Sequence, residues 1–199
     1  ILDYLKKKNN HFSLRFLFLT ETIGCIAYIN KNYKNLKEKV IGGYVLSCVG
    51  DERKYSYINT KYSNSISDYA IKKAFKESRI KFKNFSFLNR GSDERQYNSA
   101  GIPIGTFCRS KFGDYKEYHT SLDNFKLVTA KGLQGSFNMI LKTIKYFKIF
   151  YYDSKNNFRK QEKYKKNYSK VICEPFLEKR NLFPKSGNLE EKKGRLTIN

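Results

Sequence analysis

The feature that most constrains the fold is an apolar run at residues 40–49, which reads VIGGYVLSCV and stops abruptly at Gly50, Asp51 and Glu52. A strand covered on both faces has a nearly continuous apolar sequence of this kind, whereas a strand with one face in water alternates apolar and polar residues. Such covered strands occur in parallel sheets with helices on both sides. The run therefore predicts a buried strand in an α/β fold.

Further segments up to about residue 150 alternate between strand-like and helix-like patterns. We expect strands at 13–19, 40–49, 82–88 and 102–108, and helices at 22–31, at 68–78 with Ser67 as its cap, and at 129–150. This order predicts a three-layer α/β/α fold with a mainly parallel central sheet. Because the chain starts at Ile1 without a Met, inside an amphipathic segment, we expect the domain to be incomplete at its N-terminus.

The composition changes after residue 150. Residues 151–170 are dominated by Lys, Asn and Tyr without a sustained period, which predicts a basic linker or loop. Residues 171–176 are typical of a strand or an extended arm, and the charged end of the chain is typical of a frayed tail. We therefore divide the chain into a partial α/β domain at 1–150, a linker at 151–170, and a C-terminal arm and tail at 171–199.

The chain is strongly basic, with 40 Lys and Arg against 18 Asp and Glu and a net charge of +22. Clustered basic residues would indicate a nucleic-acid partner, but here they are spread along the chain. The chain is also rich in Asn, Tyr, Ile and Phe, a bias that an AT-rich genome produces. We therefore interpret the charge mainly as compositional and do not expect a nucleic-acid partner.

The sequence disfavours a membrane or secreted location, and it disfavours a fold stabilised by a zinc knuckle or by disulfides. No apolar run approaches the roughly 20 residues of a membrane-spanning helix, and the N-terminus lacks a signal pattern, so we expect a cytoplasmic protein with no membrane partner. The four cysteines, at positions 25, 48, 108 and 173, form no CxxC pair, which favours reduced and mostly buried thiols over a zinc knuckle or a disulfide scaffold.

Carboxylates follow two of the predicted strands. Glu21 comes just after the strand at 13–19, and Asp51 comes just after the run at 40–49. If these strands are parallel, both acids lie at the edge of the sheet where α/β proteins bind their ligands. Helix capping or a solvated turn is the alternative interpretation of each acid taken alone.

His119 lies in a polar, aromatic loop ahead of the last helix. A neutral imidazole together with carboxylates is a ligand set that zinc accepts, and an unligated Glu nearby could take a proton from bound water. A structural histidine remains the alternative. The segment 90–97, which reads RGSDERQY, contains Arg and Tyr donors that suit an oxyanion or a substrate carboxylate. A solvated loop with internal ion pairs is the alternative there.

Four segments, in this order, resemble motifs of the zinc aminopeptidase superfamily, and in particular its bacterial aminopeptidase-like branch. They are FLFLTETIG at 16–24, GDER at 50–53, RGSDERQY at 90–97 and EYHTSLDN at 117–124. The resemblance covers residues 12–147 and resumes at 173–184. It implies a metal-dependent hydrolase that acts on a peptide or amide bond of a small substrate.

The resemblance also implies roles for individual residues. Glu21 would be the general base, and Asp51 and His119 would be ligands of zinc. The substrate side would be formed by Arg90, Asp93, Glu94, Arg95 and Tyr97.

The sequence departs from the superfamily in two places. Thr22 stands where the classical enzymes have a second adjacent glutamate, and the expected upstream histidine and bridging aspartate have no counterpart, since Asp3 and His11 lie in no matching motif. We therefore expect this segment to be inactive on its own. The alternatives are a non-catalytic binding module for an anionic polymer or nucleic acid, and a decayed pseudoenzyme.

Overall fold

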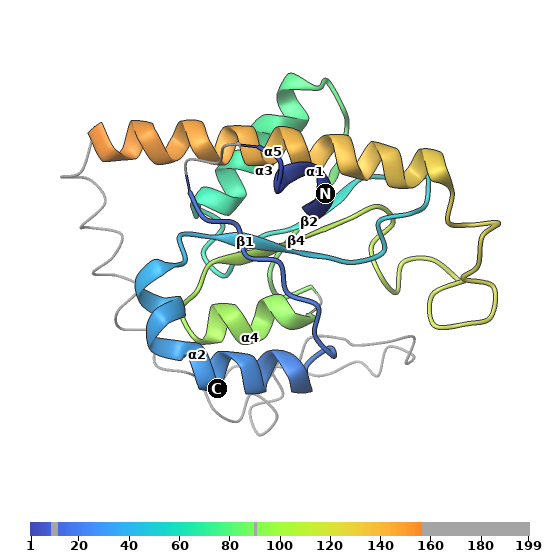
Figure 1. Ribbon diagram of the computed structural model, residues 1–199. Helices are drawn as coiled ribbons and strands as arrows, with labels where there is room; N and C mark the ends of the chain where they lie inside the picture. The colour runs from blue at the N-terminus through green and yellow to red at the C-terminus, as the bar shows by residue number, and fades with distance from the viewer. Residues whose placement is uncertain (9–11, 90, 157–199) are drawn as a thin grey trace, which may run out of the picture.

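A four-stranded sheet lies at the centre of the computed structural model, which describes residues 1–8, 12–89 and 91–156 (Figure 1). The strands are β1 (Gly43–Leu46), β2 (Ser56–Ile58), β3 (Lys83–Phe85) and β4 (Ile104–Cys108), and their order in the sheet is β1-β4-β2-β3. The β1–β4 and β2–β3 pairs are parallel, whereas the β2–β4 pair is antiparallel. The sheet is therefore mixed, and the expectation of a mainly parallel sheet holds for two of its three pairings.

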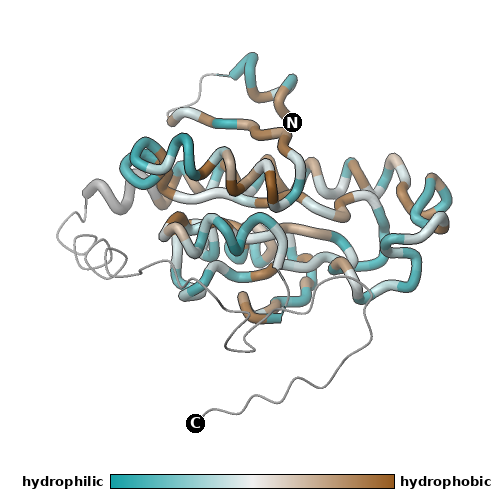
Figure 2. The backbone as a smooth tube through the Cα atoms, turned by 90° about the horizontal axis from the view of Figure 1, so that it is seen from below, coloured by the Kyte–Doolittle hydropathy of each residue, from teal (hydrophilic) through white to brown (hydrophobic). Residues whose placement is uncertain are grey.

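Helices lie on both faces of this sheet. They are α1 (Leu2–Leu5), α2 (Ile23–Lys39), α3 (Ile66–Glu77), α4 (Asp93–Ser99) and α5 (Ala130–Asn156). Figure 1 shows α3 and α5 on one face and α2 and α4 on the other. Hydrophobic and hydrophilic residues alternate along the helices in Figure 2, as expected for helices with one buried side. The α/β class is confirmed.

Two apolar clusters fill the space between the sheet and its helices. One contains Tyr57, Phe75, Phe107 and Met139 and joins β2 and β4 to α3 and α5. The other joins β4 to α2 and α4 and includes Cys25, Leu36, Tyr97, Ile102 and Ile104. All five residues of β4 are buried, because β4 is a central strand that contacts both helical layers. The fully buried strands are β2 and β4, rather than the run at 40–49.

The run at 40–49 contains a shorter and more exposed strand than its sequence predicts. Only Gly43–Leu46 pairs as β1, which is an edge strand of the described sheet and leaves Leu46 43% exposed. The expected strand at 13–19 is wrong, because this segment has no regular structure. Apolar side chains of this segment and of the start of α2 remain at the surface: Leu17, Phe18, Leu19, Ile23 and Ile26.

Helix α3 begins at a capping box that lies two residues before the cap expected from the sequence. Ser65, rather than Ser67, is the N-cap, and its hydroxyl accepts a hydrogen bond from the Asp68 backbone amide. The Asp68 carboxylate in turn accepts from the Ser65 backbone amide at 2.9 Å. Such reciprocal bonds satisfy amides that have no partner within the helix. Ser67 instead bonds to the backbone around β1 and β4, at Gly43 and Pro103.

Several other expectations concern the ends of the chain and its cysteines. Cys25 and Cys108 are buried free thiols and Cys48 is a half-buried one, as expected, whereas Cys173 lies outside the described residues. Helix α5 continues to Asn156, so residues 151–156 of the expected linker are helical, and the rest of that linker and the expected strand at 171–176 lie outside the described residues. Within the described part of the chain, no helix is both long and apolar enough to cross a membrane.

Candidate functional site

The candidate site is formed by loops that leave the carboxyl ends of β1 and β4. Because β1 and β4 are parallel and adjacent, the loops that follow them emerge at the same edge of the sheet. The Thr129 amide at the start of α5 donates to the Gly50 carbonyl at 3.0 Å, which brings α5 to the same place. The N-terminal ends of α2 and α4 are also in contact with each other.

The segments at 16–24 and 90–97 are in direct contact. The Ser92 hydroxyl donates to the Glu21 carboxylate, and the Thr22 backbone amide donates to the Asp93 carboxylate at 2.7 Å. Burial and the nearby negative charge of Glu21 raise the pKa of Asp93, although the bond from Thr22 opposes this shift. Glu21 itself is exposed at the surface. Two of the four motifs therefore form one structural unit.

Helix α4 contains two charged residues that are buried. Glu94 is fully buried, and its carboxylate accepts from the Ser92 amide at 2.9 Å and from the Thr106 hydroxyl of β4 at 2.8 Å. Burial raises the pKa of Glu94 and lowers the pKa of Arg95. The Arg95 guanidinium lies 5.1 Å from the centre of the Phe87 ring, and its Nη1 atom has no hydrogen-bond partner within the described residues.

The remaining residues of the segment 90–97 differ in their surroundings. Tyr97 lies in the apolar cluster beside Cys25, and burial raises the pKa of its hydroxyl. Arg90 lies outside the described residues.

The segments at 50–53 and 117–124 form a second unit. The Asp51 carboxylate is buried and accepts from the Ser110 amide at 2.8 Å, the Ser110 hydroxyl at 2.9 Å and the Arg53 amide at 2.9 Å. Arg53 forms a two-pronged ion pair with Glu117, at 2.7 and 3.1 Å. Hydrogen bonding from Arg53 lowers the pKa of Glu117 to about 2.

His119 lies at the surface of this second unit. Its ring stacks on Tyr118 with the ring centres 3.9 Å apart, and its backbone has a φ of 59°, in the left-handed region. A non-glycine residue rarely adopts that conformation, so the loop holds His119 in an unusual position.

The described residues contain no group of three or more His, Cys, Asp or Glu side chains that could hold a metal ion. The Asp51 carboxylate already accepts three hydrogen bonds, and Glu21 bonds to α4 rather than to the Asp51 loop. Glu21, Asp51 and His119 therefore do not form a zinc site within the part of the chain that the structure describes. A zinc ion does not fit these residues as they stand.

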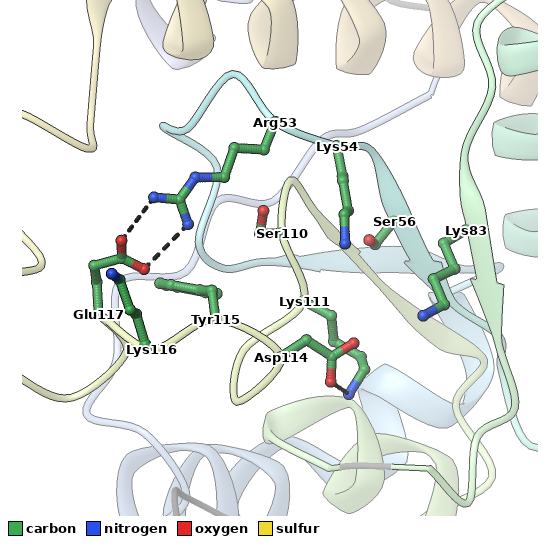
Figure 3. Close-up of a pocket in the computed structure, with 10 residues that line it drawn as sticks. All are labelled: Arg53, Lys54, Ser56, Lys83, Ser110, Lys111, Asp114, Tyr115, Lys116 and Glu117. Carbon is green, nitrogen blue, oxygen red and sulfur yellow. Dashed lines mark hydrogen bonds and ion pairs between the residues drawn. The ribbon is translucent and has the colours of Figure 1, made fainter.

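A cavity of about 350 Å³ that no sequence pattern indicates opens beside Asp51 (Figure 3). Its walls come from the loop after β1, from the first residues of β2 and β3, and from the loop after β4. The lining residues are Arg53, Lys54, Ser56, Lys83, Ser110, Lys111, Asp114, Tyr115, Lys116 and Glu117. In a chain with 40 basic residues, the lysines that meet here carry no sequence signal of their own.

Comparison with known proteins places this α/β fold among the aminopeptidase-like folds. A crystal structure of a provisionally named peptidase from Clostridium acetobutylicum matches with a TM-score of 0.68 and 35% identity, over 71% of this chain and 34% of that one. A zinc aminopeptidase from Bacillus subtilis matches with a TM-score of 0.52 and 17% identity, over 62% of this chain and 32% of that one. The second likeness concerns the fold alone.

Residues 2–149 match the family described as Domain of unknown function (DUF4910), and the chain belongs to this family. A Clostridium acetobutylicum protein, provisionally named as a polysaccharide biosynthesis protein with an aminopeptidase-like domain, is 35% identical over 187 residues. The match covers 92% of this chain and 39% of that protein, so the chain spans about two fifths of the length of this curated relative.

Proposed function

We propose that this chain is part of an aminopeptidase-like hydrolase that cleaves a peptide or amide bond of a small substrate. The observation that carries the proposal is the pairing of the four motif segments. Glu21 and Thr22 contact Ser92 and Asp93, and Arg53 contacts Glu117. Segments separated by 64 and 71 residues thus come together in the folded chain.

Glu21 is the candidate general base. Its exposed carboxylate can reach a water molecule, and the hydroxyl of Ser92 holds one of its oxygens in place. A carboxylate positioned in this way can take a proton from the attacking water. Asp93 lies beside it, bound to the Thr22 amide, and fixes the start of α2 against α4.

Arg95 is the candidate for binding the substrate. A buried guanidinium with an unpaired nitrogen costs free energy unless a ligand supplies the missing acceptor. A substrate carboxylate or carbonyl oxygen would be such an acceptor. Glu94, next to it, is held by Ser92 and Thr106 and so is less free to move.

Zinc belongs to this proposal only as a cofactor of the full-length protein. Asp51 and His119 remain its candidate ligands in this chain, but they form no metal group with Glu21 in the described structure. Additional ligands, and a rearrangement of the bonds that Ser110 makes to Asp51, would be required.

The test uses the full-length protein that contains this chain, with an aminoacyl 4-nitroanilide as substrate. A general base contributes a factor of about 10²–10⁴ to the rate, so Glu21→Gln should lower kcat by at least about 10²-fold and leave the zinc content unchanged. The matched control is Glu38→Gln, at an exposed position of α2, which should retain the wild-type rate.

Each outcome of this test has a separate meaning. A wild-type rate in Glu21→Gln would remove Glu21 from the mechanism. Full zinc content in both Asp51→Asn and His119→Gln would remove these residues as ligands. Absence of both turnover and zinc in the wild-type protein would support the decayed pseudoenzyme instead.

A further inference from the structure

The cavity beside Asp51 has an excess of positive charge. Its lining includes five cationic side chains and only two carboxylates, an excess of three. The two carboxylates are already engaged, because Glu117 pairs with Arg53 and Asp114 pairs with Lys111 at 2.7 Å. Within the described residues, Lys54, Lys83 and Lys116 form no ion pair with an acidic side chain.

The uncompensated lysines share the cavity with a buried hydroxyl. Figure 3 shows the ammonium groups of Lys54 and Lys83 and the hydroxyl of Ser56 pointing into the same space. Ser56 is 1% exposed and is the first residue of β2. The cavity therefore offers a neutral donor on a rigid strand next to two cations.

The floor of the cavity is held firmly in place. Lys111 is 6% exposed, and its ammonium group lies 4.7 Å from the centre of the Phe85 ring, while that of Lys83 lies 5.1 Å from the same ring. Cations at these distances from an aromatic ring are attracted to it. Phe85 therefore helps to hold the Lys83 ammonium group in place, while Lys111 is already paired with Asp114.

We propose that this cavity binds a doubly charged oxyanion, namely a phosphate group that is either free or attached to a small molecule. Lys54 and Lys83 supply the positive charge and Ser56 supplies a hydrogen bond, whereas Lys116 lies beside Glu117 at the other end of the cavity (Figure 3). The cavity is formed by the same two loops as the candidate site, and its Ser110 also bonds to Asp51, but Lys54, Lys83 and Ser56 have no role in the proposed hydrolysis. Nothing in the proposal requires that the chain be a hydrolase.

Charge and size select this class of ligand. At a given distance, a dianion is attracted about twice as strongly as a carboxylate, and lysine is a common phosphate-binding residue. A volume of about 350 Å³ is near the lower end for small-molecule sites, which leaves room for a small group attached to the phosphate. A nucleic-acid strand would instead need an extended basic groove with aromatic residues for base stacking.

Titration calorimetry of the full 199-residue chain with inorganic phosphate, at low ionic strength, tests the proposal. We expect saturable binding of one phosphate per chain. The double variant Lys54→Gln/Lys83→Gln should weaken it at least about tenfold, because a hydrogen bond to a charged group is worth about a factor of ten or more. The control Lys31→Gln/Lys34→Gln removes the same charge from exposed positions of α2 and should bind as the wild type does.

Two further titrations identify the source of the phosphate group. Tighter binding of glycerol 3-phosphate than of inorganic phosphate would indicate a phosphorylated small molecule, and the reverse order would indicate the free ion; both support the site. Equal binding of acetate would overturn the assignment to a dianion. Absence of saturable binding, or equal weakening in the control variant, would overturn the site itself and leave only general attraction to a chain of charge +22.

Discussion

Arg53 holds Glu117 with both terminal nitrogens of its guanidinium, at 2.7 and 3.1 Å, and so ties the loop after β1 to the loop after β4. Two parallel bonds of this kind fix the relative orientation of the partners as well as their distance. Asp51 is anchored two residues before Arg53, and His119 follows two residues after Glu117. The ion pair therefore joins the two loops that contain the candidate zinc ligands.

The ion pair predicts a pH dependence of stability. Because Arg53 lowers the pKa of Glu117 from 4.5 to about 2 in the folded chain, the folded state binds fewer protons than the unfolded state in this interval. The stabilisation is thus complete above pH 4.5 and is lost as the pH falls toward about 2. Glu117→Gln should lower the Tm by a few degrees at neutral pH, a modest effect because Arg53 is 46% exposed.

Thermal unfolding measured at a series of pH values checks this prediction. The difference in Tm between the wild type and Glu117→Gln should shrink as the pH falls through this interval. Glu38→Gln serves as the control for the general loss of one negative charge. A difference that stayed constant from neutral to acidic pH would show that Glu117 acts through packing rather than through its charge.

A glycine at the start of α5 allows this helix to approach the Asp51 loop. A Cβ atom at Gly132 would lie 1.9 Å from the carbonyl oxygen of Gly50, and backbone atoms cannot rotate away as a side chain can. Alanine normally stabilises a helix by up to about 1 kcal/mol relative to glycine. We expect Gly132→Ala instead to lower the free energy of unfolding by about 1–3 kcal/mol, the usual cost of overpacking.

Gly24→Ala in α2 is the matched control, since a Cβ atom there would meet its nearest neighbours at 3.4 Å. It should be neutral or slightly stabilising when both variants are compared by urea unfolding. Equal stabilisation by the two substitutions would contradict the close contact between Gly132 and Gly50.

Asp68 is the buried acceptor for donors from three other residues. Its carboxylate accepts from the Tyr57 hydroxyl at 2.9 Å, the Thr60 amide at 3.0 Å and the Ser65 amide at 2.9 Å. Each buried donor left without a partner costs about 1–3 kcal/mol, so Asp68→Ala should lower the free energy of unfolding by at least about 3 kcal/mol. Urea unfolding should show much less change for Glu77→Ala, at the exposed end of α3, and a similar loss in both variants would argue against this network.

The cysteines should differ in their reactivity. Burial raises the pKa of Cys25 to about 12 and also raises the pKa of Cys108, whereas Cys48 is only half-buried. Thiolate is the reactive form, so a thiol reagent at mildly alkaline pH should label Cys48 first. In a Cys173→Ser background, Cys48→Ser should abolish the rapid phase of labelling, and rapid labelling that persisted would place Cys25 or Cys108 at the surface.

Sequence patterns predicted the long helices α3 and α5 and located the short strands β3 and β4, but they missed β2 and α4. Helix α5 has a sustained period, and α3 has a recognisable cap region, so both were found close to their true bounds. β2 was missed because three residues are too few to show a period. No pattern predicts helix α4, because its polar and charged residues give no sequence sign that Glu94, Arg95 and Tyr97 are buried.

The candidate site was predictable only in part, because contacts between residues far apart in the chain leave no pattern in the sequence. The motif order predicts Glu21, Asp51 and His119 as site residues, and this stays a prediction, whereas the structure shows contacts of 21–22 with 92–93 and of 53 with 117. No pattern indicated that Arg53 pairs with Glu117, since the two residues are 64 positions apart. The distance of Glu21 from the Asp51 loop also depends on tertiary packing.

The uncovered edge of the sheet has a practical consequence for work with the chain in isolation. One side of β1 has no neighbouring strand among the described residues, and the apolar surface at Leu17, Phe18 and Ile23 is open to water. Free strand edges and contiguous apolar surface both promote contact between molecules. Purified samples should therefore associate as their concentration rises, and dilution should restore the monomer.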